Sequence, residues 1–178
     1  MGLLRSVGAA GAAIIAAAAF AACGEEERVD TGPAVSSARV AMTVTYPGFA
    51  PFALVTYRDR RGRHCHGLGT LTARGPRVLG LPGASLAEGL TRRGKCLGAG
   101  DHDVSLQVRS AGRGAPRLVG GIVRAGVTRV VVAGQAVRPR PGGEFLVAQP
   151  AGAGAIGDEI ELEYRAGEHR RLPLKLLA

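Results

Sequence analysis

The chain has 178 residues, with 23 basic and 14 acidic side chains and a formal net charge of +9. Its length fits one compact domain of ordinary size, because such domains cluster near roughly 100–150 residues, and it excludes a large two-domain enzyme. Apolar residues make up 46% of the chain, which excludes wholesale disorder. Aromatic residues contribute only 4%, so we expect a core built mainly of Val, Leu and Ala.

The first 22 residues have the layout of an export signal. A short start carries one positive charge at Arg5, and an uncharged run then extends from Ser6 to Ala22, directly before Cys23. A membrane-spanning helix needs about 20 apolar residues. This run is shorter than that and consists largely of Ala and Gly, so we expect cleavage rather than permanent anchoring.

The segment Phe20-Ala21-Ala22-Cys23 resembles the lipobox of bacterial lipoprotein signal peptides. The resemblance implies that Cys23 is acylated with a diacylglycerol and becomes the first residue of the mature chain. Membrane lipid is then a partner, and the protein lies on the extracytoplasmic face of the cell membrane. Two alternatives stay open. Ala19-Phe20-Ala21 also fits an A-x-A site for ordinary secretion, and the uncleaved run could remain as an anchor.

Residues 23–36 are predicted to form a flexible tether, because they contain clustered acids and turn-forming residues but almost no apolar side chains. Residues 37–178 are predicted to form a single domain.

The body of the chain reads as short strands separated by Gly and Pro. A period of two residues in Arg39–Tyr46 places Val40, Met42, Val44 and Tyr46 on one face of a strand. Further strands are expected at 52–58, 63–68, 77–81, 104–109, 117–123, 127–133, 144–149, 158–165 and 170–176, with one helical turn at 84–90. This spacing predicts an all-β fold, a single antiparallel β-sandwich of immunoglobulin-like or similar type.

The clearest predicted pair is the last one. Ile160, Leu162 and Tyr164 point to one side of the strand at 158–165, and three glutamates alternate with them. Arg170 and Arg171 follow after a Gly-containing turn. Cross-strand pairs of Glu and Arg on the exposed face favour an antiparallel hairpin here.

Cysteine usage points to an oxidising compartment. With Cys23 taken by lipid, Cys65 and Cys96 remain as an even pair in an exported chain, which favours a disulfide. The alternative is a reactive thiol at Cys65 beside its flanking histidines.

Three histidines are candidates for a metal site. His64 and His66 project to one face of a strand while Cys65 projects to the other, so the two imidazoles could converge on a divalent ion. His102, between two aspartates, could complete the site. An envelope metal-binding protein is therefore the alternative function, although a pair of histidines that merely flank a disulfide also fits.

Basic charge is concentrated in the body of the domain. Residues 31–157 contain 17 Lys or Arg against five acids, a net charge of +12. Guanidinium groups form bidentate hydrogen bonds with phosphate and carboxylate. The candidate contacts for a polyanion are therefore Arg60, Arg61, Arg63, Arg92 and Arg93. Aromatics are not interleaved with the charges and the chain carries an export signal, which argues against nucleic acid and favours anionic envelope polymers or lipid headgroups.

No catalytic motif stands out. The chain has no G-x-S-x-G, H-E-x-x-H or P-loop pattern. We therefore expect a non-enzymatic binding or structural protein of the cell envelope that needs no cofactor.

Overall fold

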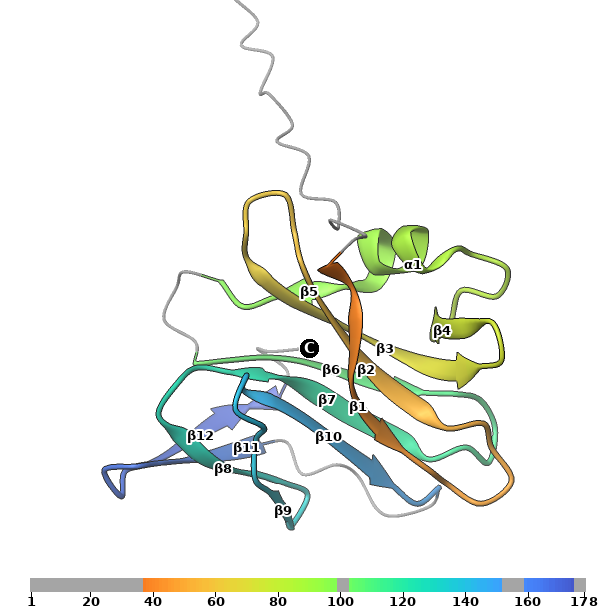
Figure 1. Cartoon of the computed structure of the whole chain (residues 1–178). Helices are drawn as coiled ribbons and strands as arrows, with labels where there is room; N and C mark the ends of the chain where they lie inside the picture. The colour runs from red at the N-terminus through yellow and green to blue at the C-terminus, as the bar shows by residue number, and fades with distance from the viewer. Residues whose placement is uncertain (1–36, 99–102, 152–158, 175–178) are drawn as a thin grey trace, which may run out of the picture.

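The computed structural model describes residues 37–98, 103–151 and 159–174. They form twelve antiparallel strands and one helix (Figure 1). The elements in chain order are β1 (Arg39–Val44), β2 (Phe52–Arg58), β3 (His64–Thr72), β4 (Gly75–Val78), α1 (Leu86–Arg93), β5 (Lys95–Cys96), β6 (Val104–Ser110), β7 (Arg117–Val123), β8 (Val127–Val132), β9 (Gln135–Val137), β10 (Glu144–Gln149), β11 (Glu159–Tyr164) and β12 (His169–Pro173).

The strands are arranged in three sheets. The first has the order β1-β2-β3-β4, with β5 also paired to β3; the second is β10-β7-β6; the third is β12-β11-β8-β9. In Figure 1 the second sheet lies between the other two. The predicted all-β antiparallel sandwich is confirmed, and it contains a third sheet beyond the two of an ordinary sandwich.

Strand β7 shows why the middle sheet can be covered on both faces. Its Leu118 packs with apolar residues of the first sheet such as Phe52, whereas the next residue, Val119, packs with those of the third, such as Val130. Six of its seven residues are buried. A Cβ at Gly121 would collide with the carbonyl of Ser105 on the neighbouring strand, so glycine permits this close approach.

The prediction for the first strand is wrong at one residue. Val40 was expected on the buried face but is exposed, while Ala41 is buried. The register between β1 and β2 shifts between Val40 and Met42, as in a β-bulge, and the extra residue reverses which side chains face inward. Beyond the bulge, Met42 and Val44 pack against the core as expected.

The terminal hairpin forms as predicted. Ile160 and Leu162 are fully buried in the core between the second and third sheets. On the other face, the carboxylate of Glu161 accepts hydrogen bonds from Arg171 Nε at 3.3 Å and is paired with His169 at 2.9 Å. Charge pairing and alternating burial therefore favour the same register.

Helix α1 covers the first sheet on the face that points away from the middle sheet. Ser85 caps its N-terminus by accepting a hydrogen bond from the Glu88 amide at 3.2 Å. Leu90 is buried against Val55 and Tyr57 of β2. The helix begins two residues later than the predicted turn at 84–90 and ends three residues later, and its Gly89 packs closely on Val78. Within the described residues, no helix is long and apolar enough to cross a membrane.

Candidate functional site

The predicted disulfide is present. The sulfurs of Cys65 on β3 and Cys96 on β5 lie 1.97 Å apart. The bond ties the segment that follows α1 to the first sheet, where the Tyr57 hydroxyl also donates a hydrogen bond to the Leu90 carbonyl at 3.3 Å. Because both cysteines are oxidised, neither offers a free thiol to a substrate or metal.

His66 points into the interior. It is fully buried, and its Nε2 lies 3.1 Å from the Ser105 hydroxyl, whereas its Nδ1 has no hydrogen-bond partner among the described residues. Burial lowers the pKa of His66 to about 3, and the positive charge of Lys95 acts in the same direction. The imidazole is therefore neutral at physiological pH.

His64 lies on the same face of β3 as His66, as predicted, but at the surface. Burial lowers its pKa below the usual value, while the nearby carboxylate of Glu144 acts in the opposite direction. His102 lies outside the described residues. The metal site built from the three histidines therefore stays a prediction.

Two other groups of potential metal ligands come together within the described ranges. One contains Asp59 with the bonded cysteines, and the other contains Glu161, Glu163 and His169. The first is occupied by a disulfide, and the acids of the second are paired with Arg129, Arg171 and His169 itself. Neither includes His64 or His66.

The turn between β2 and β3 is organised by Asp59. Its carboxylate accepts hydrogen bonds from the amides of Arg61 and Arg63 at 3.0 and 2.8 Å and from Arg63 Nε at 2.7 Å. Burial alone would raise the pKa of Asp59, but these hydrogen bonds and the Arg63 charge lower it. Arg63, a predicted polyanion contact, is thus engaged in holding the turn.

The remaining predicted basic contacts gather at one end of the molecule, called here the basic end and defined as Arg60, Arg61, Arg92 and Arg93. The first two lie in the β2–β3 turn, and the other two lie in the last turn of α1. Arg61, Arg92 and Arg93 are exposed, and Arg92 makes only a 3.5 Å surface pair with Glu88.

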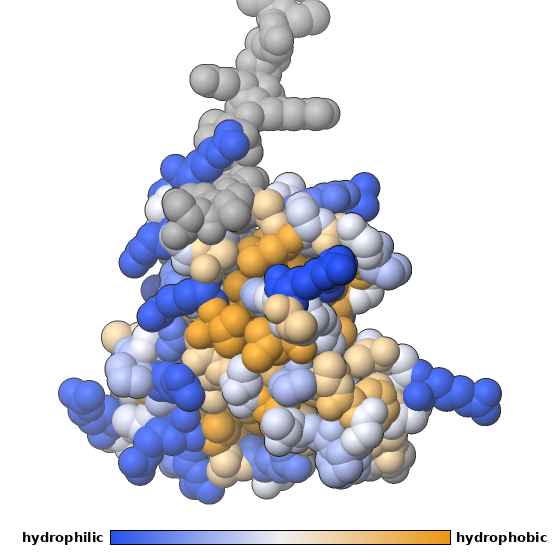
Figure 2. Space-filling view, turned by 45° about the vertical axis from the view of Figure 1, so that its right-hand side comes forward, coloured by the Kyte–Doolittle hydropathy of each residue, from blue (hydrophilic) through white to orange (hydrophobic). Residues whose placement is uncertain are grey.

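The described chain also begins at the basic end. The Ser37 hydroxyl accepts a hydrogen bond from the Arg58 amide at 2.9 Å, directly beside the β2–β3 turn. Figure 1 shows α1 and this turn at the same end as the start of β1. Figure 2 shows hydrophilic side chains at this end and also around the lower part of the molecule, with an apolar area between them. Two basic segments about 30 residues apart in sequence thus lie at the end of the molecule where β1 begins.

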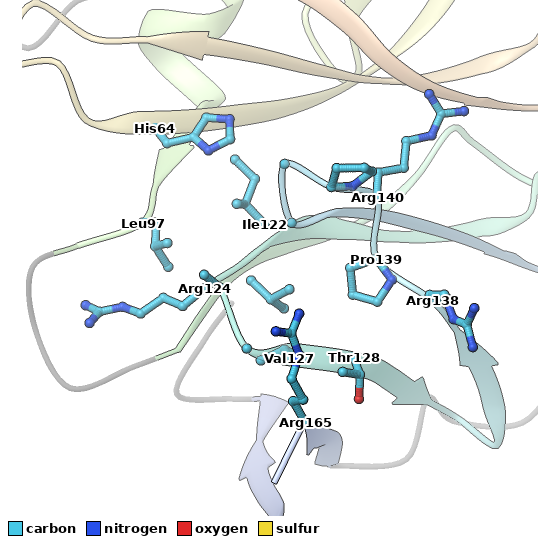
Figure 3. Close-up of a pocket in the computed structure, with 16 residues that line it drawn as sticks. His64, Leu97, Ile122, Arg124, Val127, Thr128, Arg138, Pro139, Arg140 and Arg165 are labelled. Atoms are coloured by element: carbon cyan, nitrogen blue, oxygen red, sulfur yellow. The ribbon is translucent and has the colours of Figure 1, made fainter. Parts of the chain in front are cut away.

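A groove of about 680 Å³ lies elsewhere on the molecule (Figure 3). It is formed by the β7–β8 turn, residues 138–143 ahead of β10, the tip of the β11–β12 hairpin, and His64 with Leu97. Its apolar floor contains Leu97, Ile122, Val127 and Pro139, and its basic rim contains Arg124, Arg138, Arg140 and Arg165. None of the lining residues is acidic.

The rim arginines differ in how they are held. Arg140 Nη1 donates to the Ala41 carbonyl at 2.7 Å, and Arg124 Nη2 donates to the Gly98 carbonyl at 3.0 Å. Within the described residues, the side chains of Arg138 and Arg165 have no hydrogen-bond or ion-pair partner. In Figure 3 the Arg165 guanidinium reaches over the cavity beside Val127, while the other three extend outward around it.

Sequence reasoning did not nominate this groove. Its arginines come from separate segments, which only the packing of the second and third sheets brings together. One local signal was present in Arg138-Pro139-Arg140-Pro141, where arginine alternates with proline. Because proline has a fixed φ, such a loop is stiff and can hold the arginine side chains at the surface.

In the part of the chain that the structure describes, the fold and the two basic surfaces define a disulfide-bonded, antiparallel β-sandwich protein with one helix. No protein family, no curated protein and no solved structure matches the chain.

Proposed function

We propose that this is an exported, non-enzymatic protein, held on the extracytoplasmic face of the cell membrane through acylated Cys23, whose basic end contacts anionic lipid headgroups. The observation that carries the proposal is that the β2–β3 turn and α1 lie at the same end of the molecule as the start of β1 (Figure 1), where Ser37 is bonded to Arg58 and Tyr57 to Leu90.

The position of the basic end matters because an anchor would keep it close to the bilayer. Residues 23–36 span at most about 50 Å even when fully extended, since each residue adds no more than about 3.3–3.6 Å. Each Lys or Arg near an anionic bilayer contributes about 1 kcal/mol. Three exposed arginines would therefore favour the headgroup-bound orientation roughly a hundredfold.

The test is site-resolved modification of arginine by phenylglyoxal, read by peptide mass spectrometry. The whole protein, purified from its native membrane, is placed in vesicles of phosphatidylcholine alone or with phosphatidylglycerol. We expect Arg61, Arg92 and Arg93 to react several-fold more slowly in the anionic vesicles at low salt. The protection should disappear at high salt, because ions screen exposed charges.

Internal controls come from the same spectra. Arg113 and Arg117 are exposed near the β6–β7 turn and should react equally in both vesicle types. Uniform protection of all exposed arginines, or none at the basic end, would contradict the proposal. Protection by soluble polyphosphate but not by anionic vesicles would also overturn it, and would assign the surface to an anionic envelope polymer.

A further inference from the structure

We propose that the arginine-rimmed groove binds an organic anion, with an apolar body on the floor and a phosphate or carboxylate group at Arg165. This inference does not depend on the membrane contact, because the groove and the basic end share no residue.

The size and floor of the groove favour a small molecule. Its volume of about 680 Å³ lies within the roughly 300–1,000 Å³ typical of ligand pockets, and its lining combines apolar side chains with four arginines. Leu97, Ile122, Val127 and Pro139 come from four different segments and line one cavity. Covering this floor with an apolar group would remove its surface from water, which is favourable.

The rim supplies an excess of positive charge. Three acids near it are already engaged. Asp103 accepts from the Tyr164 hydroxyl at 2.6 Å and from Arg170 Nη1 at 3.2 Å, and Glu144 accepts from Arg39 Nη2 at 3.2 Å. Glu163, which lines a neighbouring hollow together with Arg138, accepts from Arg129 Nη1 at 2.8 Å. Asp103 also lies 3.9 Å from Arg124 Nε. Arg138 and Arg165 keep no such partner within the described ranges, so an anionic ligand would complete their pairing.

Backbone hydrogen bonds fix the main chain of the rim residues in the absence of a ligand. The Arg165 amide donates to the Gly126 carbonyl at 2.9 Å, which fixes the hairpin tip against the β7–β8 turn. The Arg140 amide donates to the Glu144 carbonyl at 2.8 Å. A site with a fixed backbone loses less conformational entropy on binding. The long Arg165 side chain still has to settle on the anion, where its guanidinium can form two parallel hydrogen bonds.

Three probes separate the parts of this proposal. We would titrate the whole protein by calorimetry with 1-naphthyl phosphate, 1-naphthol and inorganic phosphate. The first carries both an apolar body and an anionic group, and each of the others carries one. We expect 1-naphthyl phosphate to bind at least tenfold more tightly than either of the others.

Variants then locate the binding. Arg165→Ala should weaken 1-naphthyl phosphate at least tenfold, and Arg165→Lys should weaken it less, because lysine keeps the charge but loses the two-pronged geometry. Arg113→Ala removes an exposed arginine near the β6–β7 turn and should leave the affinity unchanged. Thermal unfolding of each variant confirms that the fold is retained.

Equal affinity in the wild type and Arg165→Ala would overturn the proposal. So would a phosphate or naphthol affinity equal to that of 1-naphthyl phosphate, because the site would then recognise only a charge or only an apolar group. These results leave the phenylglyoxal experiment unaffected, so the two proposals fail independently.

Discussion

Replacing both Cys65 and Cys96 by serine is expected to lower the free energy of unfolding by about 3.7 kcal/mol at 25 °C. The disulfide joins residues separated by 31 positions, and closing a loop of that length restricts the unfolded chain by about this amount. The measurement is urea unfolding of the double variant and of the wild type, each with and without reductant.

Reductant should destabilise the wild type and leave the double variant unchanged. The loss should be most evident around β5, which consists of Lys95 and Cys96 and is paired with β3. The Gly94 amide, which donates to the Leu90 carbonyl at 2.7 Å, should exchange its hydrogen faster in the double variant. An unchanged urea midpoint in the double variant would show that the bond does not stabilise the fold.

Lowering the pH from 6.5 towards 3 is expected to destabilise the protein by several kcal/mol through His66. Burial holds the pKa of His66 at about 3 in the folded protein, whereas in the unfolded chain it returns to about 6.5. Below pH 6.5 the unfolded chain therefore binds a proton that the folded protein does not. The stability is fully present above pH 6.5 and is lost as the pH falls through this window.

His66→Gln provides the test, because glutamine is polar but does not titrate. Urea unfolding between pH 6.5 and 4.5 should show a clear slope of stability against pH in the wild type and a much smaller slope in the variant. Buried acids such as Asp59 act mainly below this range. His64→Gln should remove a smaller part of the slope, since His64 is only half-buried. An undiminished slope in His66→Gln would contradict the assignment.

Much of the fold could be predicted because the alternation of apolar and polar residues marks the strands and the Gly and Pro residues mark the turns between them. The strand at 117–123 and the terminal hairpin with Ile160 and Leu162 appear where the pattern places them. The bulge at Val40 could not be predicted, since period two continues through it in the sequence and only pairing with β2 reveals the extra residue. The third sheet also depends on packing between distant strands, which a local pattern does not encode.

The two basic surfaces also differ in how far the local sequence predicts them. Arg61 and Arg92 could be nominated from local charge density, but that they meet at one end depends on α1 folding back onto β2. Arg165 gave no signal of its own, because its partners in the groove lie 22 or more residues away in sequence. The disulfide could be predicted because Cys65 and Cys96 are the two cysteines that remain once Cys23 is assigned to the expected lipid anchor.

The intact mass of the protein purified from its native membrane tests whether the chain is exported and anchored through Cys23. We expect a chain that begins at Cys23, carries the added mass of a diacylglycerol, and gains about 2 Da on reduction of the Cys65–Cys96 bond. A lipid-free chain, or one that begins at another residue, would contradict the anchor and remove the reason for placing the basic end at a membrane.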